Sequence, residues 1–358
     1  MASVHDYTTS TDMVCFAPSL PAWRQTGVLC GYQTNKLVAN KAEDNQLDAI
    51  GEKEPSQLNK HRAGYVSILG RPNVGKSTFL NHVLGVKLSI TSTKPQTTRH
   101  RILGIHSSDD YQIMFLDTPG MIRPKYLLQD FMMSAVQAAI EDADVILFMV
   151  QASERLWPDD ELYLDRMKAR DKPIIVLINK IDLVKKSRLL PMMEQIVRDY
   201  GLDVLIPISA LHEDGLERVM PEIVSRLPES PPFYPHDQLT EHPERFIVAE
   251  MIREQIFEHY GEEIPYSTTV SIEEYQEHEG KKDVISAIIY VERSSQKGIL
   301  IGKKGSALKT IGQAARQEIE AFLQRPVFLE LWVRVKEKWR ADAQAIREFG
   351  YGAKLPRR

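Results

Sequence analysis

The sequence predicts an α/β protein in which a doubly wound, mostly parallel sheet is followed by a smaller α+β domain. Strand-like and helical segments alternate from residue 65 to about residue 209, and a proline-rich stretch then separates them from a second set of elements. With 358 residues the chain exceeds one ordinary domain, and 43% hydrophobic and 26% charged residues are typical of globular proteins. We therefore expect two hydrophobic cores.

The first domain, placed at residues 61–227, contains a series of strand-like segments, most of them joined by helical segments. They are Tyr65–Leu69, Ile102–Ile105, Gln112–Asp117, Val145–Gln151, Ile174–Asn179 and Val204–Ser209. Such alternation is typical of a sheet whose parallel strands are covered by helices on both faces. The longest apolar runs, residues 145–150 and 174–178, have the length of strands and are too short to cross a bilayer.

A proline-rich linker is predicted at residues 228–242. Pro228, Pro231, Pro232 and Pro235 interrupt every periodic pattern there, and Pro243 follows. Proline lacks a backbone N–H and fixes φ, so neither a helix nor a central strand can continue through this stretch. The stretch therefore marks the boundary between the two domains.

The second domain, placed at residues 243–342, shows the element order α-β-β-α-α-β. Its first helix runs from about Pro243 to Tyr260, with apolar residues at four-residue spacing. Strands follow at residues 266–275 and 284–291, two helices flank a glycine-containing loop, and a last strand covers residues 327–336. Alternate residues of the last strand are apolar, which predicts one buried face. We expect residues 343–358 to be a C-terminal tail.

The N-terminal residues 1–60 show no sustained helical or strand period, and we expect a disordered extension. A cleavable targeting peptide is the alternative, but Asp6 and Asp12 interrupt its start and no long apolar region follows. The two cysteines, Cys15 and Cys30, both lie in this extension. The sequence therefore suggests neither a disulfide framework nor a thiol nucleophile in the folded body, and a reducing compartment fits.

A glycine-rich loop follows the first strand and precedes a helix. It consists of Gly70, Arg71, Pro72, Asn73, Val74, Gly75, Lys76 and Ser77. The glycines let backbone N–H groups turn toward a phosphate chain, Lys76 reaches the terminal phosphates, and the Ser77 hydroxyl binds Mg²⁺. The succession of strand, loop and helix predicts a nucleotide-binding site.

A second motif, Asn179-Lys180-Ile181-Asp182, stands at the carboxyl end of a buried strand, where ligands of open sheets bind. The Asp182 carboxylate can accept hydrogen bonds from N1–H and the N2 amino group of guanine, a pair of donors that adenine lacks. The Asn179 amide can read the O6 and N7 side. Ser209 and Ala210 end the last strand, where the Ala210 backbone would support the base. With the loop at 70–77, these residues predict GTP or GDP as the ligand.

The motif Asp117-Thr118-Pro119-Gly120 ends the third strand. Asp117 is placed to hold magnesium, and the Gly120 N–H is placed to sense the γ-phosphate. Between the first helix and the second strand, residues 94–100 are polar, and we expect a mobile segment that orders when GTP binds. A threonine of this segment, assigned to Thr98, would join Ser77 and Asp117 around the metal.

The second domain carries a Gly-x-x-Gly loop, Gly302-Lys303-Lys304-Gly305. The glycines allow a phosphate backbone to come close, and the lysines supply positive charge. The whole chain has a net charge of −4, but its C-terminal segment is basic. Lys309, Trp332 and Arg334 are further residues predicted to bind RNA. The alternative is a solvated basic helix turn, which the order of the surrounding elements disfavours.

Together these residues resemble the Era family of GTPases over residues 65–351. The resemblance rests on the loop at 70–77, the segment Gln96-Thr97-Thr98-Arg99-His100, the motifs at 117–120, 179–182 and 208–210, and the loop at 302–305. It implies a P-loop GTPase domain with a doubly wound sheet, followed by a type II KH domain whose loop clamps single-stranded RNA. It also implies hydrolysis of GTP to GDP with Mg²⁺.

The resemblance further implies partners and a location. Era proteins bind small-subunit (16S-type) ribosomal RNA near its 3′ end and act in rRNA processing and small ribosomal subunit biogenesis. They also associate peripherally with the inner face of the cell membrane, although no amphipathic anchor is evident in this sequence. We expect a cytoplasmic monomer with peripheral membrane association.

Met121 follows Gly120, where many signalling GTPases carry the glutamine that orients the attacking water. Methionine cannot do this. The resemblance implies that Asn73 helps hold a potassium ion (K⁺) that neutralises charge between the phosphates; the alternative is that Asn73 only stabilises the loop by a local hydrogen bond. The residues expected to act in hydrolysis are Lys76, Thr98, Gly120 and Asn73, and we expect slow intrinsic turnover.

Two other functions fit parts of the sequence. A metabolic phosphotransferase could use the same P-loop, but neither a substrate lid nor a catalytic acid is recognisable, and the guanine motif disfavours it. A non-enzymatic RNA-binding module with a structural nucleotide would show no turnover and no effect of GTP on RNA affinity.

Overall fold

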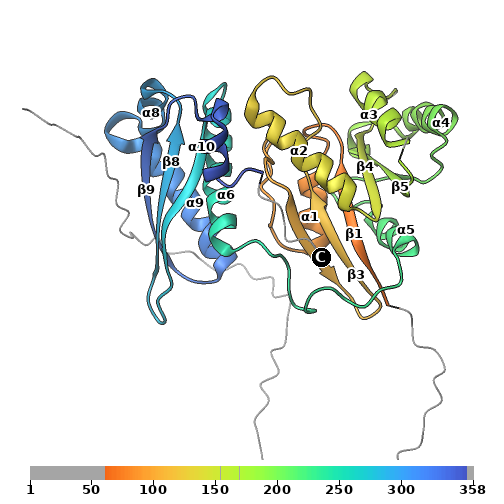
Figure 1. The fold of residues 1–358 in the computed structure, drawn as a ribbon, viewed down its shortest axis with the longest axis horizontal. Helices are drawn as coiled ribbons and strands as arrows, with labels where there is room; N and C mark the ends of the chain where they lie inside the picture. The colour runs from red at the N-terminus through yellow and green to blue at the C-terminus, as the bar shows by residue number, and fades with distance from the viewer. Residues whose placement is uncertain (1–60, 154, 169, 353–358) are drawn as a thin grey trace, which may run out of the picture.

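The computed structural model describes residues 61–153, 155–168 and 170–352 (Figure 1). The predicted N-terminal extension, its targeting alternative and residues 353–358 of the predicted tail lie outside the described residues. Figure 1 shows two units side by side, each built on its own sheet and joined by a segment that crosses between them. None of the described helices combines the length and the apolar composition that a bilayer span requires.

The first sheet has six strands in the order β2-β3-β1-β4-β5-β6. They are β1 (Arg62–Leu69), β2 (Ile102–Ser107), β3 (Tyr111–Asp117), β4 (Val145–Gln151), β5 (Ile174–Asn179) and β6 (Leu205–Pro207). β2 pairs antiparallel with β3 at one edge, and all other neighbours are parallel. The predicted doubly wound, mostly parallel sheet is confirmed.

Helices cover both faces of this sheet. α1 (Lys76–Leu84) and α5 (Val219–Arg226) pack on one face, and α2 (Leu127–Asp142), α3 (Pro158–Lys168) and α4 (Leu189–Tyr200) extend the core on the other. The central strands β4 and β5 are buried on both faces, which explains their almost continuously apolar sequences. Because β1, β3 and β5 run parallel, the loops that follow them emerge at the same edge of the sheet.

The proline-rich linker, residues 228–242, lies along the outer strands of the first sheet. The Ile105 N–H donates to the Leu239 carbonyl (2.8 Å), and the Thr240 hydroxyl donates to the Leu103 carbonyl (2.6 Å). The prolines prevent regular helix and sheet, as predicted. Hydrogen bonds to an edge strand nevertheless fix the path of the linker, because β2 has unpaired backbone groups to offer.

The second domain has a three-stranded sheet in the order β7-β8-β9, in which β7 is antiparallel and β9 parallel to β8. Its elements are α6 (Glu244–His259), α7 (Ile264–Ser267), β7 (Thr269–Gln276), β8 (Asp283–Val291), α8 (Ser294–Ile301), α9 (Ser306–Leu323) and β9 (Val327–Val335). α6 and α9 cover one face of the sheet. The predicted order is confirmed, except that the short helix α7, with Pro265 in its first turn, delays the first strand to Thr269.

Residues 343–352, part of the predicted tail, are folded against the first domain. α10 (Ala343–Glu348) places Ile346 in an apolar cluster with Trp339 and with Leu128 and Met132 of α2. The Trp339 indole N–H donates to the Ser267 carbonyl (2.9 Å). This segment therefore joins α2 of the first domain to the second domain.

The last buried side chain of this segment is Tyr351, which is 3% exposed. Its ring stacks on the His100 ring with 4.4 Å between the centroids, and its hydroxyl lies 3.0 Å from the Thr269 hydroxyl. Burial lowers the pKa of His100 to about 4, so that the imidazole is neutral near pH 7. The stack is thus a neutral aromatic contact between the two domains.

We expect Leu128→Ala to lower the free energy of unfolding by about 2–5 kcal/mol, because it leaves a cavity between α2 and α10. The matched control Leu190→Ala removes the same atoms from a helical side chain that is 60% exposed. It should cost less than about 0.5 kcal/mol. Urea denaturation of the full chain measures both values, and equal effects would contradict the packing of Leu128 against the C-terminal segment.

Candidate nucleotide site and nucleic-acid interface

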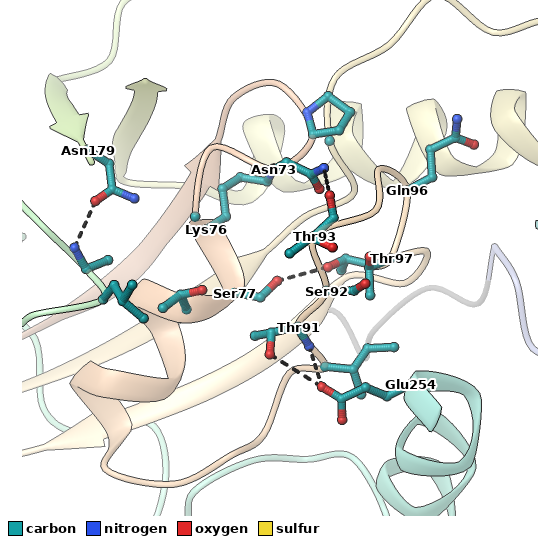
Figure 2. A pocket seen from close by; sticks show the side chains of 18 of the residues that line it. Asn73, Lys76, Ser77, Thr91, Ser92, Thr93, Gln96, Thr97, Asn179 and Glu254 are labelled. Atoms are coloured by element: carbon teal, nitrogen blue, oxygen red, sulfur yellow. Dashed lines mark hydrogen bonds between the residues drawn. The ribbon is translucent and has the colours of Figure 1, made fainter. Parts of the chain in front are cut away.

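A cavity of about 810 Å³ opens at the carboxyl ends of the parallel strands (Figure 2). Its walls come from the glycine-rich loop, from residues 90–98, and from the loops that carry Lys180 and Ala210. Glu254 of α6 and Glu318 of α9 also line it. The second domain therefore contributes to the same cavity as the predicted nucleotide motifs.

Lys76 is the buried cation of this cavity. Its ammonium donates to the carbonyls of Gly70 (3.3 Å) and Arg71 (2.9 Å). Burial lowers the pKa of Lys76 to about 8, although the Asp117 carboxylate acts in the opposite direction. A buried ammonium lacking a full counter-charge favours an anion, so the site fits the phosphates of a nucleotide.

The residues of the glycine-rich loop divide into two groups. Pro72, Asn73, Gly75, Lys76 and Ser77 line the cavity. The Arg71 Nε instead donates to Asp160 of α3 (2.8 Å), and its guanidinium lies 4.8 Å from the centre of the Trp157 ring. Val74 packs in the apolar core. Arg71 and Val74 therefore anchor the loop to the domain through their side chains.

Asn73 connects the glycine-rich loop to the segment that precedes β2. Its backbone is left-handed, with φ of 62°, and its Nδ2 donates to the Thr93 carbonyl (2.5 Å), as Figure 2 shows. This hydrogen bond differs from the local one predicted as the alternative role for Asn73, because it reaches the segment before β2 rather than staying within the loop. A potassium-binding role for Asn73 remains a prediction.

Three oxygen-bearing side chains predicted to hold a metal meet beside the loop. The Ser77 hydroxyl donates to the Asp117 Oδ2 (2.7 Å) and lies 2.9 Å from the Thr98 hydroxyl. The buried Asp117 Oδ1 has no hydrogen-bond partner among the described residues, and burial raises the pKa of this carboxyl group. Carboxylate and hydroxyl oxygens are the ligands that Mg²⁺ prefers, so these residues fit a magnesium ion.

The turn after β3 brings a second backbone against the glycine-rich loop. The Thr118 hydroxyl donates to the Ile68 carbonyl (2.7 Å), and Pro119 is buried beside it. Gly120 lines the cavity, and a Cβ at this position would lie 2.6 Å from the backbone nitrogen of Pro72. Only glycine fits this close approach, which leaves the Gly120 backbone next to the loop.

Met121 lies at the edge of the site with its side chain turned into the core. Its N–H donates to the Gly70 carbonyl (3.0 Å), and the thioether packs in the same apolar cluster as Leu69. Met121 is not among the cavity-lining residues of the described chain. Its contribution to the site is therefore made by the backbone.

Asn179 and Ser209 organise the end of the cavity predicted to hold the base. The Asn179 Nδ2 donates to the Val74 carbonyl (2.7 Å), and its Oδ1 accepts from the Ala210 N–H (2.8 Å). Both halves of this amide are thus bonded within the protein, and its role as a base reader remains a prediction. The Ser209 hydroxyl donates to the Asp182 carboxylate (2.6 Å), which orients that acceptor.

The same end of the cavity contains apolar residues that the sequence reasoning missed. Leu183 and Leu211 line the cavity and are 68% and 67% exposed. Each directly follows a predicted motif residue, and this position in the sequence could have identified both as cavity-lining residues. Lys180 is left-handed with φ of 67°, and the Ile181 N–H, beginning the next turn, donates to the Ile208 carbonyl (3.3 Å). Exposed apolar groups around Asp182 suit the faces of a planar base.

Residues 91–99, which we call the switch segment, contact the second domain. The Thr91 N–H donates to Glu254 (2.9 Å), and the Lys94 ammonium donates to the carbonyls of Phe257 and Tyr260. Thr97, Thr98 and Arg99 are buried. α6 and α7 thus supply partners that the local sequence does not reveal. That GTP orders residues 94–100 remains a prediction.

Gln96 joins the switch segment to α2. Its Oε1 accepts from the Gln129 Nε2 (3.0 Å), and its backbone is left-handed, with φ of 61°. The sequence analysis singled out Gln96 only as part of the motif at 96–100 and did not predict its contact with α2. The contact brings the segments before β2 and after β3 together at one side of the cavity.

The Gly-x-x-Gly loop of the second domain turns sharply between α8 and α9. Gly302, Lys304 and Gly305 all have positive φ, at 71°, 51° and 76°. The side chains of Lys303, Lys304 and Lys309 are exposed. Glycine-permitted backbone and free ammonium groups at one turn are suited to binding a phosphate backbone.

Trp332 and Arg334 lie on the opposite face of the small sheet from the helices. They alternate along β9 with the buried residues Leu331 and Val333, which face α6 and α9. Trp332 is half-buried and Arg334 is exposed. The structure therefore brings together the three predicted RNA-binding lysines but places Trp332 and Arg334 on a different surface.

Comparison with known proteins identifies the family. A family described as 50S ribosome-binding GTPase matches residues 65–180, and a KH domain family matches residues 263–340. The chain is 48% identical over 290 residues to GTPase Era of Geotalea uraniireducens, which covers 81% of this chain and 98% of the relative. The chain belongs to the GTPase Era family. It is a P-loop GTPase with a C-terminal KH domain, and it hydrolyses GTP.

A second Era relative and two solved Era structures agree. GTPase Era of Lacticaseibacillus paracasei is 45% identical over 297 residues, covering 83% of this chain and 99% of the relative. The crystal structure of Aquifex aeolicus Era Y63A bound to GDP·AlF4⁻ has a TM-score of 0.79 at 44% identity, covering 82% of this chain and all of that one. A structure of Era in complex with MgGDPNP and nucleotides 1506–1542 of 16S ribosomal RNA gives the same values. The Era resemblance is confirmed, and neither the phosphotransferase nor the non-enzymatic module is favoured.

We expect nucleotide affinity to fall as the pH rises above about 8, the value to which burial lowers the pKa of Lys76. Below that pH the free protein carries a charged Lys76, whereas above it the neutral amine must take up a proton when phosphate binds. The apparent affinity for GDP should fall by up to about tenfold per pH unit.

Calorimetric titration with GDP at about pH 7 and about pH 9, in buffers of different ionisation enthalpy, measures this proton uptake. The control Lys76→Arg keeps its charge at both values and should take up no proton. If the unmodified chain also takes up no proton at the higher pH, the lowered pKa of Lys76 is wrong.

Proposed function

We propose that this Era-family GTPase is a GTP-controlled switch that binds small-subunit ribosomal RNA near its 3′ end, and that it acts in rRNA processing and small ribosomal subunit biogenesis. The observation that carries the proposal is the match, over both domains at 44% identity, to Era in complex with MgGDPNP and nucleotides 1506–1542 of 16S ribosomal RNA. Exposed lysines at the Gly-x-x-Gly turn support the same function.

In this proposal the phosphates of GTP lie at the glycine-rich loop, where Lys76 binds and orients them. Ser77, Thr98 and Asp117 would hold Mg²⁺, which neutralises negative charge on the phosphates when it is bound. Gly120, kept small by its approach to Pro72, offers its N–H to the γ-phosphate.

Asp182 would select the base in this proposal. Ser209 orients its carboxylate by donating to Oδ1. That carboxylate suits the N1–H and N2 donors of guanine, and a base without these donors would leave it unpaired.

We propose that hydrolysis depends on a potassium ion near Asn73, because the core-facing Met121 cannot orient water. Turnover by the full chain should be slow, and it should be faster in potassium than in sodium buffer at equal ionic strength. Asn73→Ala should remove the difference between the two buffers, whereas Asn81→Ala, an asparagine of α1, should keep it. Equal turnover in both buffers would reject the potassium site while leaving the GTPase assignment intact.

A chain of contacts supports coupling between the nucleotide and the RNA loop. Lys94 of the switch segment donates to the Tyr260 carbonyl at the end of α6. The Tyr260 hydroxyl donates to the Leu300 carbonyl (2.9 Å), shortly before Gly302. A nucleotide that reorders the switch segment would thereby change the support of the Gly-x-x-Gly loop.

The test measures RNA affinity of the full chain with GDPNP, GDP or no nucleotide, at one stated salt concentration. The probe is an RNA with the sequence of 16S nucleotides 1506–1542, and a scrambled RNA is the control. GDPNP should shift affinity for the specific RNA severalfold, and joint Lys303→Ala and Lys304→Ala changes should abolish binding. Tyr260→Phe should bind RNA but respond less to nucleotide.

Two results would contradict parts of this proposal separately. If RNA affinity is the same with GDPNP, with GDP and without nucleotide, the two binding sites are not coupled and the switch proposal is wrong. If the scrambled RNA binds as tightly as the specific one, the ribosomal target is wrong.

We also propose, from family resemblance, that the chain works as a cytoplasmic monomer with peripheral association at the inner face of the cell membrane. Sedimentation of the purified chain tests whether it is a monomer. Co-sedimentation with vesicles of anionic lipid tests whether it associates with a membrane.

A further inference from the structure

One buried guanidinium from the second domain reaches the backbone of the switch segment. Arg253 of α6 is 0% exposed, and its Nη2 donates to the Thr97 carbonyl (2.6 Å). The next residue, Thr98, places its hydroxyl 2.9 Å from that of Ser77, which in turn donates to Asp117. The contact of Arg253 is therefore one peptide unit away from the candidate metal ligands.

Arg253 is itself held in place by a carboxylate on the same helix. Its Nε donates to the Glu250 Oε1 (2.8 Å), and its Nη2 also contacts the other Glu250 oxygen. Burial alone would raise the pKa of Glu250, but the neighbouring Arg253 outweighs it and lowers this pKa. The pair stays ionised, and the two-pronged contact fixes the direction in which the guanidinium points.

A second guanidinium fixes the residue on the other side of Thr98. Arg99 donates through Nη1 to the Thr268 carbonyl (2.7 Å) and through Nη2 to the Pro265 carbonyl (2.8 Å). The guanidinium groups of Arg99 and Arg253 lie 5.8 Å and 5.4 Å from the centre of the Phe257 ring. Thr98 is thus flanked by two residues, each anchored to the second domain.

Arg253 contacts the backbone of Thr97 rather than its side chain, so the contact orients the peptide group. The Thr97 hydroxyl donates elsewhere, to the Lys94 carbonyl (2.8 Å). Only the carbonyl faces Arg253, and that carbonyl belongs to the peptide that leads into Thr98. Rotating this peptide would carry the Thr98 hydroxyl away from Ser77.

We propose that Arg253, held by Glu250, is a positioning residue through which the KH domain sets the Thr98 hydroxyl for the magnesium-bound triphosphate and so raises selectivity for GTP over GDP. The inference rests on the proposed assignment of Ser77, Thr98 and Asp117 to Mg²⁺. Because coupling between sites is reciprocal, whatever displaces α6 would change nucleotide preference, and nucleotide would bias the position of α6.

The test compares equilibrium binding of GDPNP and GDP to the full chain, with Mg²⁺ and with EDTA. Removing Arg253 alone would leave Glu250 buried without a partner, so the main variant is the joint change Glu250→Gln and Arg253→Met. It should weaken GDPNP binding about tenfold in Mg²⁺, as expected for one hydrogen bond to a charged group, with GDP binding unchanged. In EDTA the difference should disappear.

The matched control is Arg245→Met, which removes an exposed arginine from the same helix and should leave the GDPNP to GDP ratio unchanged. If the joint variant fails to fold, Arg253→Lys decides, because it keeps a cation beside Glu250 but loses the planar fork. It should show the same selective loss in smaller measure.

Two outcomes would overturn the positioning role. Either the variants bind both nucleotides like the unmodified chain, or they lose affinity for both equally, as a purely structural defect would cause. Failure of the proposed metal assignment looks different, because the unmodified chain would then bind GDPNP equally well with Mg²⁺ and with EDTA.

Discussion

The burial of Thr97, Thr98 and Arg99 of the switch segment between the two domains is the constraint on which the rest of the structure depends. Backbone groups that are removed from water must find partners inside the protein. Arg253 and Glu254 of α6 supply a donor and an acceptor, while Arg99 reaches back to carbonyls at the end of α7. The two buried guanidinium groups beside the Phe257 ring are compensated in part, Arg253 by the Glu250 carboxylate and the Thr97 carbonyl and Arg99 by the carbonyls of Pro265 and Thr268.

This constraint makes the nucleotide cavity a property of both domains. The glycine-rich loop and the base motifs are held by the sheet, through contacts such as that between Asn179 and the Val74 carbonyl. The remaining wall is held by α6, which is also the helix that carries the core of the KH domain. A displacement of the RNA-binding domain would therefore alter this wall of the cavity.

Much of the fold was predictable because its signals are local. The strands β4 and β5 match the predicted bounds, since a buried parallel strand is a short apolar run. The candidate metal ligands Ser77 and Asp117 could be placed together because Ser77 stands after β1 and Asp117 ends β3, and these two strands are parallel neighbours. The sequence could not reveal contacts that no helical or strand period marks. These are the burial of Thr97, the hydrogen bonds between the linker and β2, and the packing of residues 343–352 against α2. Alternation along β9 placed Trp332 and Arg334 on the sheet face away from the helices. They were nevertheless predicted to bind RNA together with the lysines because they lie in the same basic segment of the sequence.

The position of Tyr351 in the chain determines when its stack on His100 can form during synthesis. His100 lies directly after the switch segment, whereas Tyr351 lies near the C-terminal end of the described residues and is synthesised after the elements of the KH domain. Domains generally fold as units during synthesis, the N-terminal one first. Were the GTPase domain to fold first in this chain, its nucleotide site would lack the wall that α6 supplies until the KH domain had emerged.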